Sequence, residues 1–166
     1  MRKVSWKSLI TIFIFVVLSG CSSDVVDGDR HLSRNIHETM SNYIIEKYAT
    51  SYPETDKQFE VHKVYGTSES DGILTVYMWS LFGGYNKETG LEEQCGHSLP
   101  AVIRLKNDSG EYKVIDYKEP KDGSEYLASI KKLFPKKYIK YIHRDAGNVK
   151  ELQKEMDKKV EKWLNK

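Results

Sequence analysis

The order of hydrophobic and polar residues divides the chain into an early helix, a central group of strands and a helical end. Between residues 32 and 48 the apolar side chains recur at three- and four-residue steps, which is typical of an amphipathic helix. These side chains are Leu32, Ile36, Met40, Tyr43, Ile44 and Tyr48. Pro53 follows, so we expect the helix to end before it. We interpret His37, at the edge of the stripe, as a packed, hydrogen-bonded histidine rather than a ligand.

From residue 59 the pattern changes to a two-residue alternation, which predicts β-strands. The first alternating segment spans residues 59–66, and a turn with Asp71-Gly72 at its tip follows. Residues 73–82 are bulky on both faces, as expected for a central strand covered on both sides. Gly83-Gly84 then permits a bulge or a bend, and residues 86–90 are typical of a hairpin loop.

A second hairpin is predicted from residues 101–105 and 111–117, with Pro100 at its start. Beyond it, Asp122 or Ser124 can cap a helix, which Pro135 stops or kinks. The last helix is expected to begin at the cap residue Asn148. Its apolar stripe lies within about 120° of arc and consists of Val149, Leu152, Met156, Val160 and Trp163.

This order of elements predicts the α+β class. An N-terminal helix followed by a four-stranded antiparallel meander, with further helices at the C-terminus, resembles the cystatin-like and NTF2-like folds. That resemblance implies a curved sheet wrapped around the first helix, but it does not define a function. We expect residues 32–166 to form a single domain, since they show no internal repeat and no second compositional region.

The first 20 residues have the layout of a secretory signal peptide. Arg2, Lys3 and Lys7 precede an apolar run at 9–18, and the small pair Ser19-Gly20 follows it. The run has about half of the roughly 20 apolar residues that a membrane-spanning helix needs. We therefore expect residues 1–20 to be removed.

The sequence Leu18-Ser19-Gly20-Cys21 resembles the lipobox of bacterial lipoproteins. The resemblance implies that Cys21 carries a diacylglyceryl group and becomes the new N-terminus, at the outer face of the cytoplasmic membrane. Two acyl chains suffice for stable anchoring. Residues 21–31 lack any helical or strand period, so we expect the lipidated cysteine and a flexible tether there. Residues 64–85 also resemble mature segments of uncharacterised lipoproteins from low-GC Gram-positive bacteria. This resemblance does not identify an activity.

Removal of the signal peptide changes the charge balance. The chain has 26 Lys and Arg and 24 Asp and Glu, and loss of the three basic residues leaves 23 against 24. The remaining charge is uneven, because residues 124–166 hold 12 basic and 6 acidic residues. Cys95 is the single cysteine left after lipidation, so no intrachain disulfide can form.

Cys95 is also the candidate nucleophile. With His97 two residues away and Gln94 beside it, Cys95 could belong to a thiol-dependent hydrolase. A catalytic histidine normally arrives from a distant segment, however, so we favour a loop with a small, partly buried thiol. The five histidines show no metal-ligand spacing, and we expect neither a metal nor a cofactor.

The last helix carries a row of four lysines opposite its apolar stripe: Lys150, Lys154, Lys158 and Lys162. The row is either a solubilising face or a contact with anionic lipid or wall polymer, where each lysine contributes about 1 kcal/mol. Four aromatic residues near the Gly-Gly pair are candidates for a contact surface, with a place in the core as the alternative: Tyr77, Trp79, Phe82 and Tyr85.

Taken together, the sequence favours a lipid-anchored extracytoplasmic binding or accessory module at the cell envelope, without catalysis of its own. An envelope protein or an anionic polymer is the expected partner, and nucleic acid is excluded by the compartment. The alternatives are a small envelope hydrolase that uses Cys95 and His97, and a small-ligand carrier with a pocket between helix and sheet.

Overall fold

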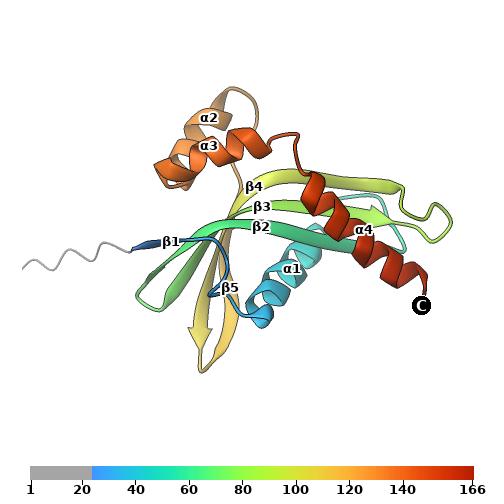
Figure 1. Cartoon of the computed structure of the whole chain (residues 1–166), viewed down its shortest axis with the longest axis horizontal. Helices are drawn as coiled ribbons and strands as arrows, with labels where there is room; N and C mark the ends of the chain where they lie inside the picture. Colours follow the sequence, from blue (N-terminus) through green and yellow to red (C-terminus); the bar gives the residue numbers. More distant parts are fainter. Residues whose placement is uncertain (1–23) are drawn as a thin grey trace, which may run out of the picture.

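The structure is a computed structural model that describes residues 24–166 (Figure 1). The signal peptide and the lipobox cysteine Cys21 lie outside the described residues. Five antiparallel strands form one sheet in consecutive order. They are β1 (Val25–Asp27), β2 (Lys57–Ser70), β3 (Ile73–Tyr85), β4 (Glu93–Asp108) and β5 (Glu111–Lys118).

The helices cover both faces of this sheet. They are α1 (Arg34–Tyr48), the short 3₁₀ turn η1 (Gly123–Glu125), α2 (Tyr126–Leu133), α3 (Lys136–Asp145) and α4 (Lys150–Leu164). Figure 1 shows α1 on one side of the long strands and α2, α3 and α4 on the other. The predicted α+β class is therefore confirmed.

Two details of the predicted order are wrong. The sheet has five strands rather than four, and the first described element is the strand β1 rather than a helix. Val25 pairs with Ser68 and Asp27 with Gly66, so part of the expected tether belongs to the sheet. Three residues without an alternation of their own are held by pairing with a distant strand, which a local pattern does not reveal.

The sheet is wide at one end and narrow at the other. β1 pairs with β2 only at residues 66–68, and β5 pairs with β4 only from Val102 onward. Within the described part of the chain, the edge of β2 from Lys57 to Val64 is therefore open. Pro100 lies in β4 outside the β5 pairing, where its missing N–H breaks no bond to β5.

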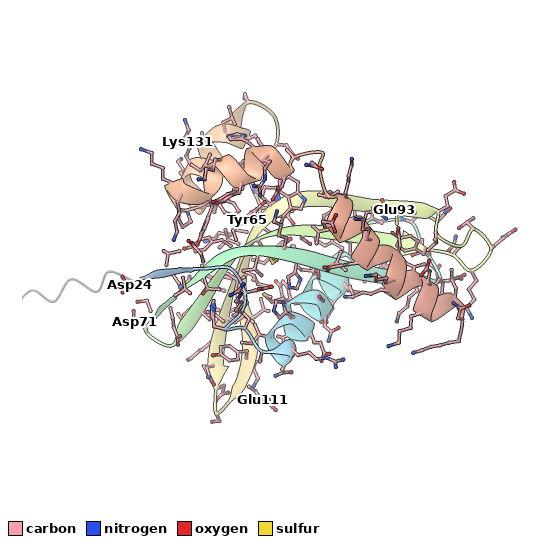
Figure 2. The ribbon with its side chains drawn as sticks, viewed as in Figure 1. Asp24, Tyr65, Asp71, Glu93, Glu111 and Lys131 are labelled. Carbon is pink, nitrogen blue, oxygen red and sulfur yellow. The ribbon has the colours of Figure 1, made fainter. Side chains whose placement is uncertain are left out.

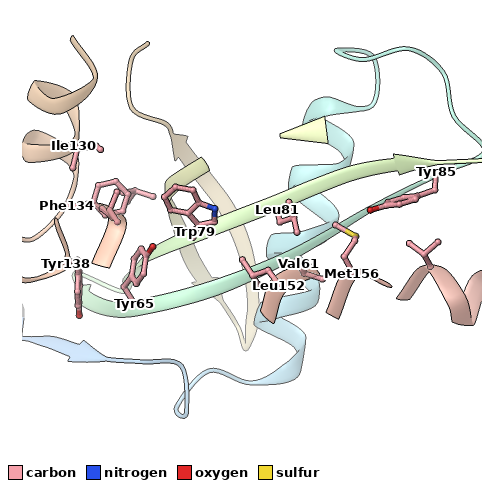
Figure 3. Close-up of a cluster of buried hydrophobic side chains, with 13 residues drawn as sticks. Val61, Tyr65, Trp79, Leu81, Tyr85, Ile130, Phe134, Tyr138, Leu152 and Met156 are labelled. Atoms are coloured by element: carbon pink, nitrogen blue, oxygen red, sulfur yellow. The ribbon is translucent and has the colours of Figure 1, made fainter. Parts of the chain in front are cut away.

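Each face of the sheet has its own core, because successive side chains of a strand point to opposite faces. On the α1 face, Ile36, Met40 and Ile44 pack against buried residues of the sheet. On the other face, Figure 3 shows side chains of α2, α3 and α4 packed on Val61, Trp79 and Leu81. The apolar stripe predicted for the last helix is confirmed, since Leu152, Met156 and Val160 are buried.

The expected aromatic contact surface is wrong. Trp79, Phe82 and Tyr85 are 3% exposed or less, and they belong to the two cores. Tyr77 is half-buried and packs against Phe134 and Tyr138. β3 is the middle strand and is covered on both faces, so its large side chains stabilise the interior instead of contacting a partner.

Two boundaries also differ from expectation. Residues 93–100 extend β4 instead of forming a loop, so Cys95 and His97 lie in a strand. A bulge is present beside the Gly-Gly pair, as the glycines predicted, since Gly84 faces Cys95 whereas Tyr85 faces Glu93. α4 begins at Lys150 without a side-chain cap, so Asn148 is not its cap residue.

Candidate functional site

A row of buried polar side chains joins α1 to β2. Residues four apart lie on the same side of a helix, and His37 and Ser41 of α1 both face the sheet. Residues two apart lie on the same face of a strand, and Glu60 and His62 of β2 both face the helix. Ser33 caps α1 by accepting a hydrogen bond from the N–H of Ile36, which fixes where this helical face begins.

The two histidines and Glu60 form a continuous hydrogen-bonded chain. The Glu60 carboxylate oxygen Oε2 lies 3.0 Å from Nδ1 of His62. The other ring nitrogen of His62, Nε2, lies 2.8 Å from Nδ1 of His37. The carboxylate accepts from Nδ1–H of His62, so Nε2 of a neutral His62 is an acceptor and Nδ1–H of His37 is its donor. The arrangement thereby leaves Nε2 of His37 as an acceptor.

The two imidazole rings lie end to end rather than face to face. Their planes differ by 11° and their centroids are 5.1 Å apart. This separation is accounted for by the 2.8 Å hydrogen bond plus one ring radius on each side. Two nitrogens aimed at one another along this line make a straight hydrogen bond. A metal ion bound to both would require the nitrogens to stand farther apart and to point at a common centre.

Glu60 is the innermost group of this chain, with 1% of its surface exposed. Ser41 Oγ donates to its Oε2 and Ser80 Oγ to its Oε1, each at 2.7 Å. Burial by itself raises the pKa of the Glu60 carboxyl, but His62 and the two serine hydroxyls outweigh burial and hold the pKa below its ordinary value. The carboxylate is thus ionised in the interior, which orients the imidazole of His62.

The outer end of the chain opens into a cleft of about 390 Å³. The cleft follows the open edge of β2, with α1 on one side and α4 on the other; its lining includes His37, Asn42, Phe59, His62 and Lys159. Lys159 Nζ of α4 donates to the backbone carbonyl of Glu60 at 2.8 Å, so this carbonyl points outward. Burial and the nearby His62 lower the pKa of His37, which favours the neutral ring.

Cys95 and His97 lie on the same face of β4 as this chain, but they are not arranged as a catalytic pair. His97 is enclosed by Tyr48, Tyr52 and Phe82, and its Nδ1 lies 3.0 Å from the Tyr52 hydroxyl. Cys95 Sγ is 3.9 Å from the carbonyl oxygen of Pro53.

The protonation states of the two residues also differ from those of a thiolate–imidazolium pair. Burial raises the pKa of the Cys95 thiol and lowers the pKa of His97 to about 4, so both are neutral near pH 7. A reactive cysteine needs the opposite shifts. Gln94, which lies beside Cys95 in the sequence, is the bulge residue, and its side-chain amide donates to Thr89 and to the Glu92 carbonyl.

The four lysines of the predicted row, Lys150, Lys154, Lys158 and Lys162, are all exposed on α4. Lys154 pairs with Glu151 at 2.8 Å, so part of the row is neutralised locally. Within residues 24–166, no three His, Cys, Asp or Glu side chains gather in a way that could hold a metal ion.

The sequence pointed to only one member of this site. His37 is hydrogen-bonded, as expected, but its partner is His62 of β2, and we did not predict a role for His62 or Glu60 from the sequence. The signal that could have found them is the pair Glu60 and His62 at alternate positions of a strand, on the face that also holds Val64. A carboxylate and an imidazole on a covered face must be paired to each other or to the covering element.

No protein-family model matches the chain, and no curated protein or solved structure matches it either. Of the helices in the described part, none combines the length and the apolar character needed to cross a membrane.

Proposed function

We propose that the protein is a lipid-anchored extracytoplasmic binding or accessory module, and that the cleft between α1 and the open edge of β2 is its ligand site. The observation that carries this proposal is the chain Glu60–His62–His37, which runs from a buried carboxylate to the cleft. A cleft lined by a histidine that is hydrogen-bonded, through a second histidine, to a buried carboxylate is a candidate functional site.

Burial of the ionised Glu60 carboxylate destabilises the folded state unless its partners compensate for the lost hydration. An ionised carboxylate loses several kcal/mol on transfer from water to the interior, and hydrophobic residues of the same volume would often give an equally stable core. Here the cost is met by two serines and a histidine that have no other described partner for these atoms. The arrangement fixes the proton on His37 Nδ1 and so presents Nε2 as an acceptor. The ligand that fits is one with an O–H or N–H donor.

The proposed location follows from Cys21. A diacylglyceryl group on this residue would hold the protein at the outer face of the cytoplasmic membrane. Since β1 begins at Val25, only residues 22–24 separate the anchor from the sheet, which is about 10 Å of extended chain. The domain would lie against the bilayer, where an envelope protein or an anionic polymer is the expected partner.

The test is native mass spectrometry of the full-length protein isolated from its own membrane. We expect a retained ligand mass that is lost in His37→Ala and kept in His143→Ala, because His143 is an exposed histidine of α3 away from the cleft. Equal retention by both variants would show that the cleft is not the ligand site. A mature mass without two acyl chains would contradict the anchor independently.

The rival hypothesis is a thiol-dependent hydrolase, in which Cys95 would be the nucleophile. The neutral thiol and neutral imidazole described above do not favour it. Replacement Cys95→Ser decides the matter, because it leaves a packed side chain of similar size but removes the nucleophile. We expect an unchanged phenotype and an unchanged retained mass; loss of function in a stably folded Cys95→Ser protein would favour the enzyme.

The cystatin-like or NTF2-like arrangement also remains part of this proposal. Two features support it. In the sequence, α1 directly precedes β2 to β5, which are consecutive in the sheet, and in space α1 packs on one face of that sheet. In such an arrangement the space between helix and sheet is the natural place for a ligand.

A further inference from the structure

The most one-sided charge of the described chain lies on α2 and α3. Residues 126–145 contain one acidic residue, the buried Asp145, and six basic residues: Lys131, Lys132, Lys136, Lys137, Lys140 and Arg144. In α4, by contrast, residues 150–164 contain five basic and four acidic residues, a net charge of +1. The charge of the C-terminal third is therefore concentrated on the α2–α3 pair and not on the lysine row of α4.

All six basic side chains are exposed, while the opposite sides of the two helices are buried. Ile130, Phe134, Tyr138 and Ile142 face the sheet, so the lysines necessarily face outward. Leu127, an apolar residue of α2, is 55% exposed. We call the six basic residues together with Leu127 the α2–α3 basic face; two of the six are ion-paired, Lys137 with Asp27 and Arg144 with Asp145.

This face lies beside the start of the described chain. Lys137 Nζ is 2.7 Å from the carboxylate of Asp27 and 3.2 Å from the carbonyl oxygen of Val25, and the Tyr138 hydroxyl donates to Asp27 at 2.7 Å. Figure 1 shows β1 and the α2–α3 pair at the same end of the molecule, whereas the C-terminal end of α4 lies at the opposite end. Figure 2 shows the labelled Lys131 side chain on the outer surface of this pair.

A Cβ at Gly66 shows how closely this end is packed. It would overlap the Tyr138 hydroxyl and the carbonyl of Val26, so β1, β2 and α3 meet without space for a side chain. Tyr65 also lies parallel to the rings of Tyr138 and Tyr141 of α3. The position of the α2–α3 basic face relative to β1 is therefore fixed, and so is its position relative to the point where the anchor would leave.

We infer that the α2–α3 basic face docks on the anionic lipid of the membrane that holds the protein. This inference rests on the proposed lipid anchor at Cys21. With three residues between anchor and sheet, the end of the molecule that carries β1 is held at the bilayer surface, within reach of the headgroups. Lysines near an anionic membrane are attracted within about a Debye length of 8 Å at physiological salt, and exposed Leu127 provides an apolar contact. Docking would leave α4 and the cleft turned away from the lipid.

The test is acetylation footprinting of the mature lipidated protein, reconstituted in phosphatidylcholine vesicles with or without phosphatidylglycerol. We expect phosphatidylglycerol to slow acetylation of Lys131, Lys132, Lys136 and Lys140 at least about 3-fold, and high salt to abolish the effect. The lysines of α4 provide the internal control and should react at the same rate in both vesicles.

A charge variant makes the test independent of lysine reactivity. With Lys131, Lys132, Lys136 and Lys140 all changed to Gln, amide hydrogen exchange over residues 126–144 should no longer slow in phosphatidylglycerol vesicles. The matched variant, in which Lys150, Lys154, Lys158 and Lys162 are changed to Gln, should keep that slowing. Both sets are exposed, so circular dichroism should show both variants folded.

Several outcomes would overturn the inference. Protection of the α4 lysines instead would assign the membrane contact to the row predicted from sequence. Equal labelling in both vesicles would exclude an anionic-lipid contact, and protection by soluble polyphosphate but not by phosphatidylglycerol would assign the face to a polymer. Protein that lacks acyl chains and does not float with phosphatidylcholine vesicles would instead contradict the proposed anchor, which separates the two failures.

Discussion

Two buried carboxylates, one on each face of the sheet, are stabilised in different ways. Glu60 lies on the α1 face with 1% of its surface exposed, and Asp145 lies at the end of α3 on the other face with 5% exposed. Asp and Glu are residue types that are rarely buried in an apolar core unless their carboxylates are paired. Both carboxylates accept three hydrogen bonds or ion pairs, yet the partners are of different chemical kinds.

Asp145 is surrounded by permanent cations. Lys63 Nζ lies 2.7 Å from its Oδ2, Arg144 Nε lies 3.1 Å from its Oδ1, and the Tyr65 hydroxyl donates to Oδ2 at 3.1 Å. Burial by itself raises the pKa of Asp145, but Lys63 and Arg144 outweigh burial and lower it. The Lys63 and Arg144 side chains are 44% and 56% exposed, so both charges keep much of their hydration. The result is an ion cluster that joins α3 to β2 at neutral pH.

Among residues 24–166, neither Lys nor Arg pairs with the Glu60 carboxylate. Its partners are two hydroxyls and an imidazole, and the imidazole leads through His37 to the cleft. An imidazole changes its protonation within the physiological range, whereas Lys and Arg do not. The comparison shows that a buried acid can serve as a fixed link between elements or as the inner end of a hydrogen-bonded chain to a cleft, depending on its partners.

Replacement of Glu60 by Gln should have the largest effect on stability. The amide would place its own N–H groups against the donors Ser41, Ser80 and His62, so at least one buried donor would lose its acceptor. We expect a loss of about 3 kcal/mol in the free energy of unfolding, measured by urea denaturation at pH 7. The control is Glu38→Gln, at an exposed carboxylate of α1, which should change the free energy of unfolding by less than about 0.5 kcal/mol. If Glu60→Gln cost as little as the control replacement, the buried Glu60 carboxylate would not stabilise the fold in the way proposed.

Replacement of Asp145 by Asn should cost less, about 2 kcal/mol. Its cationic partners are about half exposed, so water can solvate Lys63 and Arg144 when the carboxylate is lost. Urea denaturation of Asp145→Asn beside the exposed Asp122→Asn checks this estimate. If Asp145→Asn lowered the free energy of unfolding more than Glu60→Gln, the exposure of the partner side chains would not determine the cost of losing a buried carboxylate.

The sequence predicted the helices of this fold better than its polar site. The three- and four-residue spacing of Ile36, Met40 and Ile44 is a local property, and these residues are buried as expected. The same holds for Leu152 and Met156 in α4. Helices form from contacts within a few residues, so their apolar face appears directly in the sequence.

The strands and the site depend on contacts that no local pattern contains. β1 exists because Val25 meets Ser68, and Glu60 becomes a site residue because α1 brings His37 and Ser41 above it. Large aromatic residues such as Trp79 predict a strand, but whether they face solvent or helices depends on which elements cover the sheet. For the same reason, the sequence does not predict that Lys137 pairs with Asp27, the contact that places the α2–α3 basic face beside β1.

His97 is a further titratable group on the α1 face, and its burial should make the stability of the protein depend on pH. His97 takes up a proton near its ordinary pKa of 6.5 in the unfolded chain but only near pH 4 in the folded one, because burial disfavours its charged form. Between these values the unfolded state binds more protons, so stability falls as pH falls from about 7 to about 4.

We therefore expect His97→Phe to reduce the loss of stability between pH 7 and pH 4.5 by about 1 kcal/mol, a value lowered for the partial exposure of the ring. Phe keeps the contact with Phe82 and removes the titrating group. Urea denaturation at both pH values gives the difference, and the exposed His143→Gln serves as control. An unchanged pH dependence in His97→Phe would show that burial of His97 is not the source of the acid sensitivity.

The smallest effect, and the most direct test of the difference between the carboxylates, is that of salt. From about 0.1 M to about 1 M salt the Debye length falls from about 10 Å to about 3 Å, which weakens interactions of exposed charges but hardly affects buried ones. The cost of Asp145→Asn should therefore shrink by about 0.5 kcal/mol in high salt, because Lys63 and Arg144 reach into solvent. The cost of Glu60→Gln should stay constant, since the Glu60 and His62 side chains are 0% and 4% exposed. Equal salt dependence of the two costs would mean that water and ions reach both carboxylates. The Glu60–His62–His37 chain would then not be shielded from solvent.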